Sequence, residues 1–270
     1  MPMPATDLSI IVPTYHREQE LREAVSSALS LTALRIEVIV VDDSPEASAE
    51  PVIRAMDDPR LSYRRRQNPV GGRPARIRNE AAAVSKGALL YFLDDDDRTI
   101  PDNLALAHDA LRAAPAGVLV GMARPFGTDG DRVDNEVRYF ERAKAFLETT
   151  TGRMPMVARL LFDNTPLVCS SCLVKRETFM AVGGFDDTLP LFEDLEFYLR
   201  AIRLHGWLYW REPILERRVG GVTLISAARR DEIDESYRLI HRSYRQHHSL
   251  LEFAALKASN AWSRLGAPVA

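Results

Sequence analysis

Four consecutive aspartates at positions 94–97 directly follow the apolar run at 88–93. Alternate side chains of an extended segment share one face, so Asp94 and Asp96 point the same way. Two carboxylates about 4 Å apart repel by roughly 1 kcal/mol in water and by about 4 kcal/mol at an effective dielectric constant of 20. Mg²⁺ or Mn²⁺ would remove that repulsion, because both ions prefer hard oxygen ligands. The alternative is that these acids only cap the next helix, but their place at the end of a buried strand favours the cation.

Two acidic pairs stand at comparable points of the chain. Asp42 and Asp43 follow the β-branched run at 36–41, and Glu193 and Asp194 begin a segment with helical spacing that extends to 205. Acids near a helix start interact favourably with its dipole, by about 0.3 to 1 kcal/mol. An ionised carboxylate can also take a proton from a hydroxyl group. Capping and base catalysis therefore both remain open for Glu193 and Asp194.

Strands and helices are expected to alternate around these acids. Short apolar runs predict strands at 8–12, 36–41, 61–65 and 88–93, and helical spacing predicts helices near 21–32, 51–56, 74–85 and from 101. This alternation predicts an α/β fold with a Rossmann-like, mainly parallel sheet flanked by helices. Ligands bind beyond the carboxyl ends of such strands. We therefore expect the acids after 41 and after 93 at one cleft.

The second half of the chain is less regular. Residues 127–135 are polar and rich in Gly and Asp, which predicts a loop, whereas 167–174 and the "GWLYW" segment at 206–210 are expected to be strands. From 231 to about 262 apolar residues recur every three or four positions, which predicts a C-terminal helical extension. The expected division is 1–122, 123–225 and 226–270.

Composition excludes several classes of protein. A net charge of −3 and 46% hydrophobic residues indicate an ordinary globular protein without a general basic field for nucleic acid. Alternation would put the thiols of Cys169 and Cys172 on opposite strand faces, and no second pair completes a zinc site, so buried structural cysteines are expected. No apolar run reaches the roughly 20 residues of a membrane span. The chain is expected in the cytoplasm, either free or peripheral at the inner face of the membrane.

The ordered set of motifs resembles the inverting family 2 glycosyltransferases of the GT-A fold. The resemblance covers roughly 7–225 and is carried by "SIIVPTYHREQELREAVSSALS", "IEVIVVDDSP", "GGRPARIRNEAA", "SKGALLYFLDDDDRTIPDNL", "SSCLVKRETFMAVGGFDDTL" and "FEDLEFYLRAIRLHG". It implies a nucleotide-diphosphate sugar donor, with a UDP-sugar favoured, a Mn²⁺ or Mg²⁺ cofactor, and inversion at the anomeric carbon. The acceptor would be a glycan, a lipid-linked molecule or a small molecule. Residues 1–122 would bind the donor and 123–225 the acceptor.

The resemblance also implies a role for each matching residue. On the donor side, Pro13, Thr14 and Tyr15 would line the nucleoside site, Asp43 would accept from the base, and Arg73 and Arg78 would lie near the diphosphate. Asp94 to Asp96 would be the DxD triplet, with Asp96 and Asp94 as metal ligands and Asp94 and Asp95 also near the ribose or bound water.

The Glu193–Asp194 pair resembles the position of the family's general base, and Asp194 is the favoured residue. Such a group is needed because an attacking hydroxyl must lose its proton as the new bond forms. Arg218, in the late loop at 216–224, would approach the diphosphate.

Three alternatives were weighed. A nucleotidyltransferase would need a Gly-rich, basic phosphate loop after the first strand, which "PTYHREQE" does not supply. An NAD-dependent dehydrogenase would need a GxGxxG motif there. A catalytically inactive nucleotide-sugar-binding module would lack the acids that Asp96 and Asp194 provide. The sequence does not specify the sugar, the nucleobase, the acceptor, the pathway, the metal or the oligomeric state.

Overall fold

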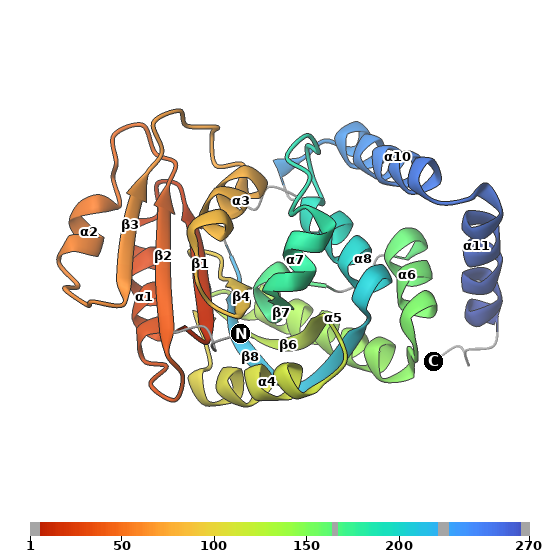
Figure 1. The fold of residues 1–270 in the computed structure, drawn as a ribbon, viewed down its shortest axis with the longest axis horizontal. Helices are drawn as coiled ribbons and strands as arrows, with labels where there is room; N and C mark the ends of the chain where they lie inside the picture. The colour runs from red at the N-terminus through yellow and green to blue at the C-terminus, as the bar shows by residue number, and fades with distance from the viewer. Residues whose placement is uncertain (1–5, 164–166, 221–226, 266–270) are drawn as a thin grey trace.

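An eight-stranded mixed sheet runs through the whole protein. The computed structural model describes residues 6–163, 167–220 and 227–265, with side chains to 261. The strand order is β3-β2-β1-β4-β7-β6-β8-β5 (Figure 1). The strands are β1 (Leu8–Thr14), β2 (Ile36–Asp42), β3 (Leu61–Arg65), β4 (Leu89–Phe92), β5 (Arg98–Thr99), β6 (Val118–Phe126), β7 (Cys172–Lys175) and β8 (Trp207–Arg218).

The first half is a parallel sheet with helices on both faces, as predicted. β1 pairs in parallel with β2 and β4, and β2 pairs in parallel with β3. The chain crosses from β1 to β2 in one direction and from β3 to β4 in the other. Right-handed crossovers therefore place α1 (Glu18–Leu29) and α3 (Pro74–Val84) on opposite faces. Burial on both faces explains why β1 and β4 are apolar along their whole length.

The second half turns the sheet into a mixed one. β7 pairs antiparallel with β4 and β6, while β6 pairs in parallel with β8 through a register shift near Met122. Helices α4 (Pro101–Ala113), α7 (Arg176–Val182) and α8 (Glu193–His205) pack against this part of the sheet. The expected strand at 206–210 is confirmed as the start of β8. The boundary expected at 122 falls inside β6.

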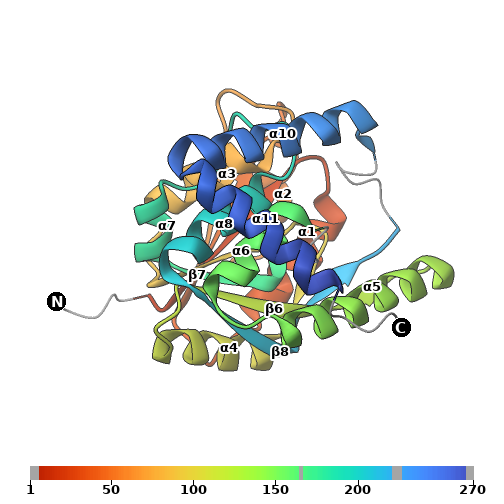
Figure 2. The same cartoon turned by 90° about the vertical axis from the view of Figure 1, so that its right-hand side faces the viewer.

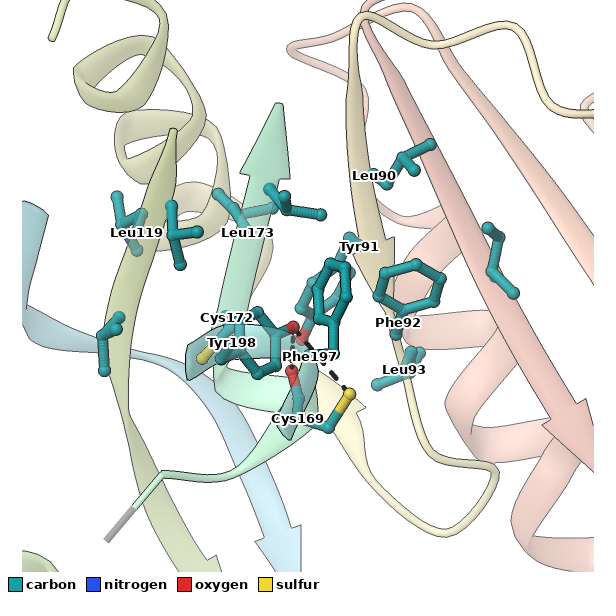
Figure 3. Packing of buried hydrophobic residues seen from close by; sticks show 14 of the residues in the cluster. Leu90, Tyr91, Phe92, Leu93, Leu119, Cys169, Cys172, Leu173, Phe197 and Tyr198 are labelled. Carbon is teal, nitrogen blue, oxygen red and sulfur yellow. Dashed lines mark hydrogen bonds between the residues drawn. The ribbon is translucent and has the colours of Figure 1, made fainter. Parts of the chain in front are cut away.

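Buried aromatic side chains of β4 and α8 meet in the core (Figure 3). Phe197 and Tyr198 of α8 pack beside Tyr91 and Phe92, and all four side chains are fully buried. The Tyr198 hydroxyl lies 3.8 Å from the sulfur of Cys169. Both cysteines are buried and free, as expected. Their simple alternation along one strand was wrong, because a 3₁₀ turn (Cys169–Ser171) precedes β7.

One other expectation needs correction. The polar segment at 127–135 is not a loop throughout, because α5 (Gly130–Thr149) begins within it and Asp129 caps that helix by accepting from Arg132 N. The expected C-terminal helical extension is confirmed and consists of two helices, α10 (Arg230–His247) and α11 (Leu250–Leu265). Helix α11 packs against α6 (Arg153–Phe162) at one side of the molecule (Figure 2). Among the described residues, no helix is both long and apolar enough to cross a bilayer.

Candidate active site

A cleft of about 550 Å³ opens at the carboxyl ends of β1 and β4. The loop after β1, the acids after β4, the first turn of α8 and the end of β8 line this cleft. Its charged lining residues are Arg17, Arg78, Asp94, Asp95, Asp96, Asp97, Glu193, Asp194, Arg217 and Arg218. The acids expected at positions 94–97 and 193–194 therefore border one cavity.

The first three acids of the run each accept from a side chain across the cleft. Asp94 Oδ1 accepts from Arg78 Nη2 at 2.7 Å. Asp95 accepts from Thr14 Oγ1 at 2.8 Å and from Arg17 Nη1 at 3.0 Å. Asp96 Oδ2 accepts from the same Arg17 nitrogen at 2.7 Å. One guanidinium nitrogen thus serves two neighbouring carboxylates.

The fourth acid has a different position. Asp97 is only 2% exposed and accepts from the backbone N–H of Arg218 at 2.9 Å, which joins the acidic loop to the end of β8. The Arg218 side chain donates back to the carbonyl of Asp96 at 3.0 Å and to Glu23 at 2.6 Å. Asp97 therefore fixes the loop, and Arg218 reaches the rim of the cleft as an anchored side chain. Residues 221–224 of the expected late loop lie outside the described residues.

The acidic run holds more negative charge than its basic neighbours offset. Burial raises the pKa of Asp95 to about 7, although Arg17 and Thr14 oppose this rise. Burial, followed by repulsion from the Asp94 carboxylate, raises the pKa of Asp96. The same two effects raise the pKa of Asp97 well above its ordinary value. A cation bound to these oxygens would reverse the penalty.

The donor set fits a hard divalent cation held only in part by protein. In the described parts of the chain, no three His, Cys, Asp or Glu side chains form a complete metal site. Mg²⁺ is usually bound by one or two carboxylates together with substrate phosphates and water. Asp94 and Asp96 border the cleft and supply carboxylate oxygens of that kind.

Arg78 connects the acidic run to the second acidic pair. Its side chain is 4% exposed, and it donates to Asp94 at 2.7 Å and to Glu193 Oε1 at 3.0 Å. Its guanidinium also lies 5.5 Å from the centre of the Phe185 ring. A buried cation with two carboxylate partners and an aromatic face is held firmly in one orientation. Arg78 borders the cleft as expected, and its contacts make it a brace between two acidic centres.

Glu193 and Asp194 occupy the first turn of α8, after Phe192 in a left-handed conformation with φ of 62°. Because Arg78 binds Glu193, Asp194 is the member of the pair without a basic partner among the described residues. Within the described parts of the chain, its Oδ1 accepts from the N–H of Leu195, at 2.7 Å. Burial and the neighbouring Glu193 carboxylate raise the pKa of Asp194 to about 7. A carboxylate with that pKa can both accept and hold a proton near neutral pH.

Some of the residues expected at the nucleoside site line the cleft, and one does not. Pro13, Thr14 and Tyr15 line the cleft, and the Tyr15 ring packs against Gly72, where an added Cβ would lie 3.3 Å from the ring. Asp42 and Asp43 are both fully buried and do not border the cleft, so the expectation that the acids after 41 share one cleft with the acids after 93 was wrong. Asp43 accepts from Arg66 and from the backbone N–H groups of Val70 and Gly72, so it holds the 70–72 loop beside Tyr15.

Arg73 lies beside a second cavity. This space of about 560 Å³ adjoins the cleft through shared residues such as Gly71, Leu191 and Glu193, and Arg73 lines it but not the cleft itself. Arg76 lines the same cavity and pairs with Asp187 at 2.8 Å. The two arginines expected near the diphosphate are therefore separated, with Arg78 in the cleft and Arg73 beyond its edge.

Sequence reasoning missed Arg17. The residue follows the first strand in the "PTYHRE" segment, and its guanidinium contacts both Asp95 and Asp96. The sequence did contain a signal for Arg17. It is an arginine in the loop after β1, and the acidic run follows β4, the strand that pairs with β1. Strand adjacency is what brings the two loops together, and β1 and β4 are 75 or more residues apart in sequence.

Comparison with known proteins shows what the chain is similar to. The model of the family described as glycosyl transferase family 2 matches residues 9–182. An uncharacterized glycosyltransferase of Haemophilus influenzae is 28% identical over 199 residues, which cover 73% of this chain and 62% of that protein. The GalNAc(5)-diNAcBac-PP-undecaprenol beta-1,3-glucosyltransferase of Campylobacter jejuni is 33% identical over 100 residues, which cover 36% and 32%. The chain thus spans less than two thirds of the length of these relatives.

Solved structures show the same fold. S. aureus TarS in complex with UDP-GlcNAc superposes with a TM-score of 0.69 at 20% identity, covering 94% of this chain and 71% of that one. The mannosyltransferase PcManGT from Pyrobaculum calidifontis, in complex with GDP-Man and Mn²⁺, superposes with a TM-score of 0.56 at 17% identity, covering 99% and 84%. At such identities the likeness establishes the architecture.

Proposed function

The chain belongs to glycosyl transferase family 2 and has the GT-A fold, and from that premise we propose a metal-dependent, inverting glycosyl transfer from a nucleotide sugar. A sugar passes from a nucleotide-diphosphate donor to an acceptor hydroxyl group. The observation that carries the proposal is the single cleft in which Asp94 to Asp96 and Asp194 meet, with Arg78 joining the two groups.

Asp96 is the proposed metal ligand, with Asp94 as the second carboxylate. When bound there, Mn²⁺ or Mg²⁺ would offset the charge that develops on the leaving diphosphate. Arg17 and Arg218 border the same part of the cleft and supply fixed positive charge toward the phosphates. Thr14 donates to Asp95 and so helps to hold the acidic loop in place beside Arg17.

Asp194 is the proposed general base. The acceptor oxygen bonds to the anomeric carbon as the bond from that carbon to the diphosphate oxygen breaks, and the hydroxyl proton goes to the Asp194 carboxylate. Attack from the side opposite the leaving group inverts the anomeric centre. Glu193 is proposed as a positioning residue, since Arg78 neutralises it and leaves the proton transfer to Asp194.

Different parts of the protein are proposed to bind the donor and the acceptor. The loop at 13–15 and the 70–72 loop held by Asp43 are proposed for the nucleoside, with a UDP-sugar favoured. The portion at 123–225 is proposed to bind the acceptor, with the second cavity beside Arg73 close to Glu193. The C. jejuni relative named above acts on an undecaprenol-linked glycan, which supports a lipid-linked glycan as one acceptor class. That class would place the enzyme at the cytoplasmic face of a membrane.

Donor hydrolysis and donor binding test the proposal together. The donor is first chosen by thermal shift with UDP-, GDP-, dTDP- and CMP-sugars in the presence of Mn²⁺. Asp194→Asn should keep donor binding and lose turnover, whereas Asp96→Asn should lose metal-dependent binding. Asp131→Asn, on the exposed first turn of α5, is the matched control and should change neither. Near-normal turnover by Asp194→Asn would contradict the assignment of the base.

A further inference from the structure

The junction of α10 and α11 forms a surface that the proposed reaction does not use. Leu250 is 67% exposed and Leu251 is 83% exposed, the largest exposed fraction among the large apolar side chains of the described residues. Both stand where α11 begins, at the edge of the molecule (Figures 1 and 2). Two adjacent leucines so far out of the core have no packing role.

Basic side chains line the part of α10 that leads to this junction. The acids of α10 lie in its first two turns, whereas its last part carries Arg238, Arg242 and Arg245. Arg238 and Arg242 are four residues apart on the face opposite the buried Ile240 and Tyr244. The Arg245 guanidinium lies 5.6 Å from the centre of the Phe253 ring of α11, at the junction of the two helices. Arg238 pairs with Glu235 at 2.6 Å, while Arg242 and Arg245 are exposed.

The outer face of α11 also carries exposed apolar side chains and a cation. Leu251, Ala254 and Ala258 are exposed at helical spacing, and Lys257 is exposed beside them. Glu252 is the only acidic residue in this helix, and it is engaged by Arg203 at 3.0 Å and by the Tyr244 hydroxyl at 2.6 Å. The surface therefore combines apolar side chains with cations and presents no unpaired carboxylate of α11.

We propose that this surface, formed by Arg242, Arg245, Leu250, Leu251 and Lys257 and called here the α10–α11 corner, docks on a bilayer that contains anionic lipids. Leucines at the boundary of the headgroups supply apolar burial, and the three cations complement the negative surface. A protruding pair of leucines suits shallow insertion into lipid better than it suits a protein partner, because a stable protein interface buries about 800 Å² on each side.

Docking at the corner would keep the cleft near the membrane surface. Helix α10 also packs beside the cleft, because Tyr237 contacts the cleft residue Phe192, directly before Glu193, with ring centres 4.9 Å apart. The proposal does not depend on the assignment of the donor, the metal or the base. Its failure would leave those assignments unchanged.

Co-sedimentation of the whole chain with lipid vesicles tests the proposal. The probes are vesicles of phosphatidylcholine alone and vesicles of phosphatidylcholine mixed with phosphatidylglycerol. The double variant Leu250→Ser/Leu251→Ser should bind the mixed vesicles at least about tenfold more weakly than the wild type, because it loses two apolar side chains. Arg242→Gln/Arg245→Gln should weaken binding roughly fivefold for each arginine removed, and added salt should weaken the wild type similarly.

The matched control is Leu106→Ser/Arg112→Gln on α4. Both side chains are exposed, and α4 lies on the opposite side of the molecule from α10 (Figure 1). This variant should bind the mixed vesicles as the wild type does. Basal donor hydrolysis should be unchanged in all three variants, which verifies that they are folded.

Three results would overturn the proposal. The first is a wild type that does not bind the mixed vesicles, and the second is equal binding to vesicles of phosphatidylcholine alone. The third is unchanged binding by the leucine variant. A dimer that this variant dissociates, in the absence of vesicle binding, would assign the corner to a second copy of the chain instead.

Discussion

Replacing Asp194 with Asn should stabilise the protein while removing transfer. Asn keeps the oxygen that accepts from Leu195 N but cannot ionise. The rise of the Asp194 pKa from its ordinary 3.8 to about 7, caused first by burial and then by Glu193, means that the ionised form opposes folding. That rise corresponds to roughly 4 kcal/mol at most. Because the side chain borders the cleft, solvent screening reduces the expected gain to about 2 kcal/mol.

The sign of the effect depends on pH. Between about pH 4 and pH 7 the folded protein holds the proton more tightly than the unfolded chain, so the free energy of unfolding of the wild type falls as pH rises. Below about pH 4 both states are protonated, and Asn brings no gain. Above about pH 7 the penalty is fully present. The melting temperature of Asp194→Asn should therefore exceed that of the wild type by about 4 to 8 °C at pH 8, and by little at pH 4 to 5.

Differential scanning fluorimetry across pH 4 to 8.5 measures this difference directly. Glu193→Gln is the informative control, because it removes a partner of the buried Arg78 and should lower the melting temperature at pH 8. A gain for Asp194→Asn that does not vary with pH, or a loss of stability at pH 8, would refute the reasoning. Turnover of the wild type should rise with pH through about 7, as the base becomes ionised.

Three other substitutions have definite expected effects. Arg78→Met should lower the free energy of unfolding by about 3 to 5 kcal/mol in urea denaturation, because Asp94 and Glu193 lose their shared buried partner, and Arg78→Lys should recover part of the loss. Equal stability of the Met variant and the wild type would contradict the structural role of Arg78. Arg17→Ala should raise the affinity for Mn²⁺ alone by roughly tenfold in calorimetry, since a competing cation leaves Asp95 and Asp96; weaker binding would show that Arg17 does not compete. Gly72→Ala should weaken donor binding and cost about 1 to 2 kcal/mol of stability, because φ is 75° and the new methyl group meets the Tyr15 ring; unchanged donor affinity would separate this loop from the nucleoside site.

The parallel half of the fold could be predicted because its determinants are local. Strands buried on both faces must be apolar throughout, and the acids that follow 88–93 mark where that strand reaches the cleft edge. The mixed half could not be read in this way. The short β7 pairs with β4 and β6, and such partners are chosen by packing between distant segments. Likewise, the polar start of α5 resembles a loop until Asp129 caps it.

The acidic residues of the site could be predicted from the sequence more fully than its arginines. Asp94 to Asp96 and Asp194 line one cleft. Asp94 to Asp96 follow from the end of a buried strand, whereas Asp194, at the start of α8, was expected from the family resemblance. Which base faces which acid depends on side-chain reach across that cleft, and sequence gives no measure of it. Arg17 was therefore missed, and Arg73 was expected beside the diphosphate although it lines the neighbouring cavity. Asp43 shows the same limit, because its partners are backbone groups of a loop about 30 residues away.

The central claim is that the acids after β4 hold a divalent cation that anchors the donor diphosphate. Calorimetric titration with the nucleoside diphosphate selected by the thermal-shift screen, with and without Mn²⁺, tests it most directly. We predict that Mn²⁺ tightens binding to the wild type by at least about tenfold, or 1.4 kcal/mol, and that Asp96→Asn abolishes this gain. Equal affinity with and without Mn²⁺ in the wild type, or a gain that persists in Asp96→Asn, would contradict the claim.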